Sequence, residues 1–160
     1  MQHLLNPDLN TIDWNQVSQL IDKVGWTDRD PEEMKQAFSK SSFTVFIIEN
    51  DQLIAMGRSV DDGRYYAILA DIIVDPDHQG KQLGDIVVNT LTEQLKDFNF
   101  VTLTSSTYKA DRFYKRLGFK KQSSAFIWPM SEKQMRQHAE PEEDEVVEKL
   151  VNEIEGVTLS

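Results

Sequence analysis

Residues 75–85, DPDHQGKQLGD, combine residue types and spacings that could hold an anion. Gly80 and Gly84 stand four positions apart, with Lys81 beside the first, between a β-branched run and a long amphipathic stretch. A tight turn from a strand into a helix exposes backbone N–H groups, and the helix dipole favours a negative charge there. The stretch therefore predicts a phosphate-binding loop. The alternative interpretation is a helix that only needs a compact start.

The usual glycine-rich and metal-binding motifs are absent from the sequence. Neither the dinucleotide fingerprint G-x-G-x-x-G nor the phosphate loop G-x-x-x-x-G-K-[ST] is present. Residues 75–80 imitate the opening of an EF-hand calcium loop, but Ile86 stands where a bidentate glutamate is required. The three histidines show no ligand spacing. We therefore expect no metal.

Residues 107–121, TYKADRFYKRLGFKK, form the second group of interest. They predict a short amphipathic helix that turns Phe113, Tyr114 and Leu117 toward the core and stops at Gly118. An aromatic pair at helical spacing is more often packed core than part of a site, so both interpretations stay open.

The elements that must position these residues follow one another in α/β order. Asp30 and Pro31 are typical of a helix start, Gly25 of a helix end and Asn50-Asp51 of a hairpin turn. An apolar run that ends at Pro76 predicts a central strand. The expected helices are 11–25, 28–38, 80–98 and 109–118, and the expected strands are 43–50, 51–60, 65–76, 100–106 and 119–130.

Composition limits the class of protein. A chain of 160 residues that is 39% hydrophobic suits one globular domain. There are no cysteines, and we expect no signal peptide, no membrane span and a cytoplasmic location. The net charge of −10 argues against nucleic acid as a partner. Residues 139–160 hold eight acidic residues and one lysine, so most of this charge belongs to a tail.

The chain accordingly divides into a catalytic or binding domain, 1–138, and an acidic extension, 139–160. Pro141 at a first helical position and the acidic residues after it predict a helix to about Glu155. This helix carries a continuous apolar stripe, which we expect to dock on its own domain or on a second subunit in a homodimer. The stripe consists of Val146, Val147, Leu150, Val151 and Ile154.

Together, VDPDHQGKQLGDIVV (74–88) and ADRFYKRLGF (110–119) resemble the GNAT superfamily of N-acetyltransferases. The family pattern Q/R-x-x-G-x-G/A falls on residues 79–84, and its closing motif falls on residues 107–119. The resemblance covers roughly residues 10 to 130. Within the superfamily, the chain looks most like small-amine acetyltransferases of the plastid and bacterial type.

The resemblance implies a mixed, mostly antiparallel sheet flanked by helices, and acetyl-CoA as co-substrate without a metal. The amides of residues 79–84 would hold the pyrophosphate, helped by Lys81 and by Lys109 or Arg112, and the pantetheine arm would lie along the central strand like an added strand. The implied cofactor-binding residues are Ile72, Ile73, Val74, Gln79, Gly80, Lys81, Gln82, Leu83, Gly84, Asp85 and Thr107.

Two positions depart from the family pattern. Gln82 replaces the middle glycine, and Thr107 replaces an asparagine and has a shorter reach. A backbone amide can donate whatever side chain it carries, so Gln82 fits the loop if its φ is negative, as in a first helical turn. We expect that conformation, because a positive φ would cost roughly 1 kcal/mol.

The resemblance also implies a direct attack of an amine on a thioester. Tyr114 matches the family's proton donor toward the departing sulfur. Asp71, in the central strand, is the candidate base through a water molecule, and Glu49 is a weaker one. Asp71 could instead only bind a neighbouring backbone group or an arginine.

The resemblance further implies a small-molecule or peptide primary amine as the acceptor, with a pocket bordered by the GWTDR loop (25–29) and by Tyr65-Tyr66. The acidic surplus favours a cationic amine, such as a polyamine, an arylalkylamine, an aminoglycoside or a lysine side chain. The alternative function is a non-catalytic acyl-CoA-binding regulatory or interaction module of the same fold.

Overall fold

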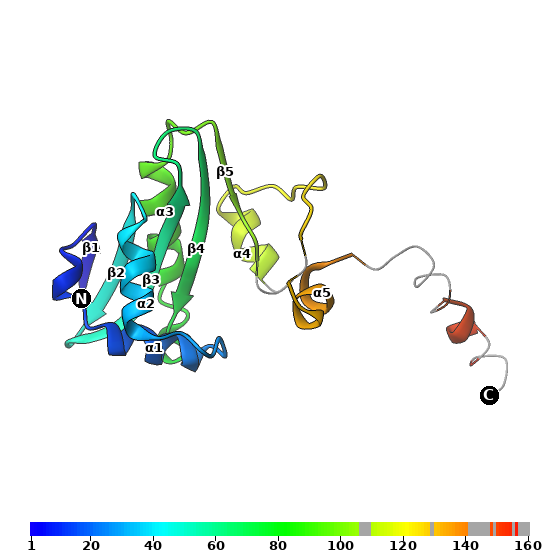
Figure 1. Ribbon diagram of the computed structural model, residues 1–160, viewed down its shortest axis with the longest axis horizontal. Helices are drawn as coiled ribbons and strands as arrows, with labels where there is room; N and C mark the ends of the chain where they lie inside the picture. The colour runs from blue at the N-terminus through cyan, green and yellow to red at the C-terminus, as the bar shows by residue number, and fades with distance from the viewer. Residues whose placement is uncertain (106–109, 129, 141–147, 149, 155, 157–160) are drawn as a thin grey trace. The chain divides into compact units, whose positions relative to one another are not determined.

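The computed structural model describes residues 1–105, 110–128, 130–140, 148, 150–154 and 156 (Figure 1). The chain divides into two compact units, Met1–Leu117 and Gly118–Ser160. All residues of the expected site that the structure describes lie in the first unit. No helix within the described residues is long and apolar enough to cross a bilayer.

The first unit is built on a five-stranded sheet with the order β1-β2-β3-β4-β5. Neighbouring strands are antiparallel except β4 and β5, which are parallel because the helix α3 crosses over between them. This mixed, mostly antiparallel sheet confirms the expected fold class. The strands are β1 (Gln2–Leu5), β2 (Thr44–Glu49), β3 (Gln52–Asp61), β4 (Tyr66–Val74) and β5 (Phe100–Leu103).

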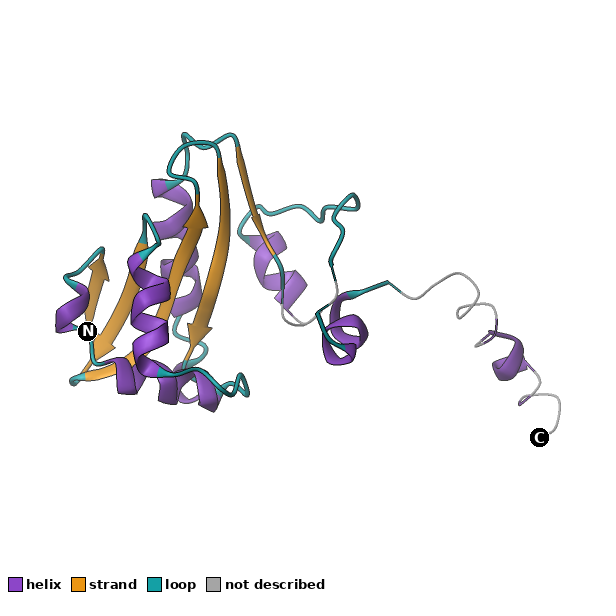
Figure 2. Cartoon of the chain, viewed as in Figure 1, coloured by secondary structure: helices purple, strands orange, loops and turns teal. Residues whose placement is uncertain are grey.

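Helices cover both faces of the sheet (Figure 2). On one face, α1 (Trp14–Lys23) and α2 (Pro31–Ser39) build the main hydrophobic core, which also contains Met56 of β3. The other face carries α3 (Leu83–Gln94), which lies close to the sheet at Gly57: a Cβ there would come within 2.6 Å of Val87 Cγ1.

Local signals in the sequence correctly predicted several element ends. The Asp30 side chain accepts hydrogen bonds from two backbone N–H groups at the start of α2, and Pro31 is its first residue. Asn50 and Asp51 form the two-residue turn between β2 and β3, both with positive φ. The helix α4 (Asp111–Arg116) is followed by Gly118 at φ 98°.

Three features differ from the expected elements. The expectation placed no element in residues 1–10, where β1 forms. Residues 119–128 and 130 form no strand, and Phe126 and Trp128 are 98% and 85% exposed, so no sheet buries them. An additional helix, α5 (Glu132–His138), follows in the second unit.

The expected acidic helix lies largely outside the described residues. Those that are described, 148, 150–154 and 156, are helical, and the side chains of Leu150, Val151 and Ile154 are exposed. Docking of this helix, on its own domain or on a second subunit, remains a prediction.

Candidate active site

The strands β4 and β5 separate along their length (Figure 1). They pair only from Tyr66–Leu69 on β4 to Phe100–Leu103 on β5, whereas β4 continues to Val74. Among the described residues, the β5-facing edge of residues 70–74 therefore has no partner strand. An open strand edge presents unpaired backbone donors and acceptors to an extended ligand.

The expected pantetheine-binding residues lie on this open edge. The side chain of Ile73 is only 3% exposed and belongs to the core against α1 and α2. Ile72 packs in the opposite direction, with its Cδ1 atom next to Gly57 under α3. The backbone of this segment is therefore free of a partner strand at the edge where the resemblance implies an added strand.

A β-bulge aims the side chain of Asp71. Met56 pairs with Ile73 and Arg58 pairs with Ala70, so two residues of β4 stand opposite a single residue of β3. Asp71 has a φ of 52°, a conformation that aspartate adopts more readily than most residues. Its Oδ2 atom accepts a hydrogen bond of 2.6 Å from Arg58 Nε.

A small cavity of about 60 Å³ lies where the two strands separate. It is lined by Trp26, Leu69, Ala70, Asp71, Ile72, Leu103, Thr104 and Tyr114. The structure thus brings together the two residues expected to be catalytic, Asp71 and Tyr114. Trp26, from the loop expected to border the acceptor pocket, also lines it, whereas Tyr65 and Tyr66 do not.

The position of Tyr114 depends on its neighbour in α4. The ring of Phe113 meets the Tyr114 ring edge to face at 4.9 Å between centroids. A Cβ on Gly84 would lie 3.0 Å from Phe113 Cζ, so this glycine gives Phe113 its space against α3. Burial raises the pKa of the Tyr114 phenol, which therefore keeps its proton at neutral and mildly alkaline pH.

The loop before α3 has the backbone geometry of an anion site. Gly80 has a φ of +82°, and a Cβ there would meet nothing within 4 Å. In the part of the chain that the structure describes, no acceptor binds the backbone N–H groups of residues 79–84. Unpaired N–H groups at the start of a 12-residue helix favour an anion such as a phosphate.

The expected negative φ of Gln82 is wrong. Gln82 is the N-cap residue of α3 with φ 59° and ψ 21°, in the left-handed region. The chain passes from a 3-10 helix (Pro76–His78) into α3 within four residues, and the turn requires this conformation. A side chain here is strained by roughly 1 kcal/mol, which explains why the family pattern has glycine at this position.

Replacing Gln82 by glycine is expected to raise Tm by about 2 °C, because the relieved strain exceeds the added entropy of the unfolded chain. The affinity for CoA should change less than about threefold, since the backbone donors remain. Calorimetry measures both quantities. Gln79→Gly is the matched control: Gln79 has φ −65°, so this variant should lower Tm. A lower Tm for Gln82→Gly than for the wild type would contradict the inference that the backbone of Gln82 is strained.

The carboxylate of Asp85, which the resemblance places in the cofactor site, is bound by Arg116. The two hydrogen bonds are 2.7 and 2.8 Å long, and Arg116 holds the pKa of Asp85 below its ordinary value. Arg116 also stacks over Phe113. Asp85 therefore fixes α4 against the start of α3.

The other described residues of the expected site do not line the cavity. Thr107 and Lys109 lie outside the described residues, and Arg112 is exposed. Glu49 lies at the end of β2, where it contacts His78 and Lys81. Within the described residues, no group of three histidines and carboxylates could hold a metal. Sequence reasoning missed Arg58, although a lone arginine in an apolar strand is a signal for a buried partner.

Comparisons with known proteins agree with this geometry. A model of the Acetyltransferase (GNAT) family matches residues 8–119. The "Uncharacterized N-acetyltransferase ycf52" of Pyropia yezoensis is 33% identical over 109 residues, which are 65% of this chain and 63% of that protein. The chain thus spans less than two thirds of the length of this relative.

Solved structures show the same fold. The protein SA2161 of meticillin-resistant Staphylococcus aureus superposes with a TM-score of 0.69 at 24% identity, over 81% of this chain and 100% of that one. The GNAT family protein SP0256 of Streptococcus pneumoniae TIGR4 superposes with a TM-score of 0.67 at 26% identity, over 82% and 100%. Since the family model covers more than half of the sequence, the chain belongs to the GNAT acetyltransferase family.

Proposed function

We propose that this protein transfers the acetyl group of acetyl-CoA to a primary amine. The observation that carries the proposal is the meeting of three features: the loop of unpaired N–H groups, the open edge of β4, and a cavity with Asp71 and Tyr114 in its wall. The loop fits the pyrophosphate of CoA, and the open edge of β4 fits its peptide-like arm. The cavity lies at this edge, where residues 70–72 line it.

Acetyl-CoA supplies a thioester, an acyl group that an amine can attack directly. The backbone of residues 79–84 would hold the phosphates, and the edge of residues 70–74 would hold the arm in an extended conformation. Trp26 and Leu69 contribute apolar surface to the wall of the cavity.

The two ionisable residues in the cavity wall have separate tasks in this proposal. Tyr114 holds a proton on its hydroxyl and donates it to the leaving group as a general acid. Asp71 binds Arg58 through Oδ2, and among the described residues no donor reaches its Oδ1. This second oxygen can accept the proton of the amine through a water molecule.

The proposal is tested by a thiol-release assay with acetyl-CoA and a panel of cationic amines, together with calorimetric titration of CoA. We expect amine-dependent thiol release. Binding of CoA without release for any amine would support a non-catalytic binding module.

Replacing Gly80 by aspartate tests the loop itself. The substitution places a carboxylate beside the pyrophosphate at a position with open space and φ +82°, so the Kd for CoA should rise at least about tenfold by charge repulsion. Gly63→Asp, at φ +78° in a distant turn, controls for backbone strain and should leave the Kd unchanged. Equal Kd values for the Gly80 variant and the wild type would exclude the loop as the phosphate site.

A further inference from the structure

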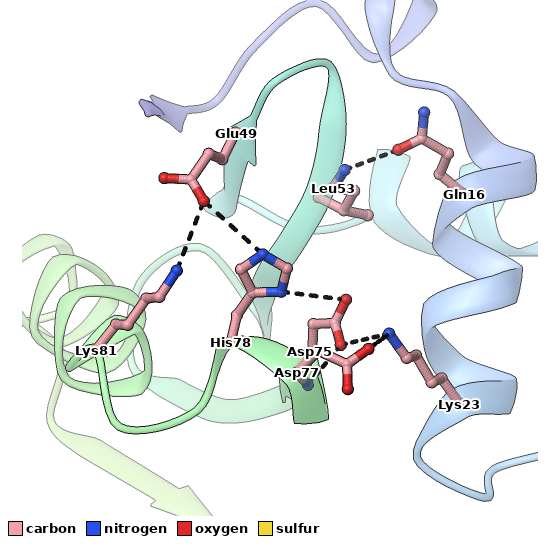
Figure 3. Close-up of polar contacts among 8 residues, drawn as sticks. All are labelled: Gln16, Lys23, Glu49, Leu53, Asp75, Asp77, His78 and Lys81. Atoms are coloured by element: carbon pink, nitrogen blue, oxygen red, sulfur yellow. Dashed lines mark hydrogen bonds and ion pairs between the residues drawn. The ribbon is translucent and has the colours of Figure 1, made fainter.

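A cluster of charged residues lies directly beside the phosphate loop and has no part in the mechanism above (Figure 3). Glu49 Oε2 is 3.7 Å from Lys81 Nζ, and the same oxygen is 3.7 Å from His78 Nε2. Lys81 is the only cation among the loop residues 79–84. One carboxylate thus pairs with the loop's cation and also contacts the imidazole of the residue directly before the loop.

The other side of the imidazole faces a second carboxylate. His78 Nδ1 lies 3.4 Å from Asp75 Oδ2. Asp75 is buried, and its Oδ1 accepts hydrogen bonds of 2.6 Å from Lys23 Nζ and 2.9 Å from the Asp77 N–H. The buried atom Nδ1 has no hydrogen-bond partner among the described residues.

Charged groups from several elements of the described chain surround His78. Glu49 comes from β2, Asp75 and Asp77 from the same turn, Lys81 from the loop, and Lys23 from α1. Lys23 is shared by the two aspartates, at 2.6 Å from each. The imidazole therefore lies between the carboxylates of Glu49 and Asp75.

We propose that Glu49 holds Lys81 away from the phosphate site, and that a proton on His78 releases it. When the pyrophosphate binds, Lys81 turns from Glu49 to the phosphates, and the imidazolium of His78, which already lies beside Glu49, remains as the cation that pairs with it. Binding of the cofactor is then coupled to uptake of a proton. The inference rests on the proposed function, because the ligand is the pyrophosphate of CoA.

The direction of the pH effect follows from this exchange. The bound state leaves Glu49 without Lys81, so His78 gains a stronger attraction for a proton on binding. A site that takes up a proton on binding gains affinity as the pH falls through the range in which imidazole titrates, about pH 8 to 5. We therefore expect CoA to bind more tightly at pH 6 than at pH 8.

Dephospho-CoA is the suitable probe, because it keeps the pyrophosphate and lacks the phosphate monoester, which itself titrates near pH 6. Its Kd should fall about threefold from pH 8 to pH 6, the effect expected of one ion pair near the surface. Calorimetry in two buffers of different ionisation enthalpy should show the uptake of part of a proton near pH 7.

Two variants test the roles of His78 and Glu49 separately. His78→Gln should bind dephospho-CoA with a Kd that is the same at pH 6 and pH 8, and without proton uptake. Glu49→Gln should bind about threefold more tightly than the wild type at pH 8, because Lys81 is free. His3→Gln, at an exposed position of β1, is the matched control and should keep the wild-type pH dependence.

The outcomes separate this inference from the proposed function. A Kd that does not vary with pH in the wild type, an unchanged pH dependence in His78→Gln, or weaker binding by Glu49→Gln would overturn the coupling while CoA binding stands. Absence of binding at every pH would overturn the proposed function as well. If the Tm shows that His78→Gln does not fold, the Kd of Glu49→Gln at pH 8 still tests the inference. Glu49 is partly exposed, so this variant should fold.

Discussion

Replacing Arg58 by methionine is expected to lower the free energy of unfolding by about 3 kcal/mol. Arg58 and Asp71 form an ion pair of 2.6 Å with side chains only 14% and 8% exposed. Methionine keeps most of the apolar stem but leaves the carboxylate buried without its cation. The value lies at the low end for a broken buried pair, because Asp71 also lines a cavity that can admit water.

The double variant Arg58→Met/Asp71→Asn distinguishes the charge from the packing. It removes both charges and should recover most of the lost stability, whereas Asp71→Asn alone leaves an unpaired arginine. Urea unfolding of the four proteins gives the coupling free energy. If the double variant were no more stable than Arg58→Met, the broken ion pair would not be the cause of the lower stability of Arg58→Met.

Replacing Tyr114 by phenylalanine is expected to lower kcat about 100-fold with an amine that the wild type acetylates. The ring and its contact with Phe113 remain, and only the proton donor is lost. General acid catalysis by one positioned group contributes about 10²–10⁴-fold, and a thiolate is already a fair leaving group, so the low end applies. Because burial raises the pKa of Tyr114, the wild type keeps this donor below about pH 10.

The measurement needs kcat, the Kd for CoA and Tm for each protein. Tyr114→Phe should keep the Kd and the Tm of the wild type. Tyr66→Phe is the control, because Tyr66 is exposed and lies outside the cavity. An unchanged kcat in a stably folded Tyr114→Phe protein would leave Tyr114 as a packed aromatic residue without a catalytic role.

Features that depend on neighbouring residues could be predicted from the sequence. The Asp30-Pro31 start of α2 and the Asn50-Asp51 turn depend on groups within four residues of each other. The motif 79–84 and Tyr114 were recognised because their residue types and spacing are typical of one family. By contrast, the short edge strand β1 carries no local signal, and it forms because β2 offers it a partner.

The arrangement of the site was decided by the tertiary structure. The bulge at Asp71 depends on the register between β3 and β4, and its partner Arg58 comes from the other strand. Gly84 is explained by the ring of Phe113, 29 residues later in the chain. Even the φ of Gln82 follows from the path between β4 and α3. The sequence alone determined which groups could do chemistry, because side-chain chemistry is a local property. Strand register and close packing join residues far apart in the chain, so only the folded structure decides which of these groups meet.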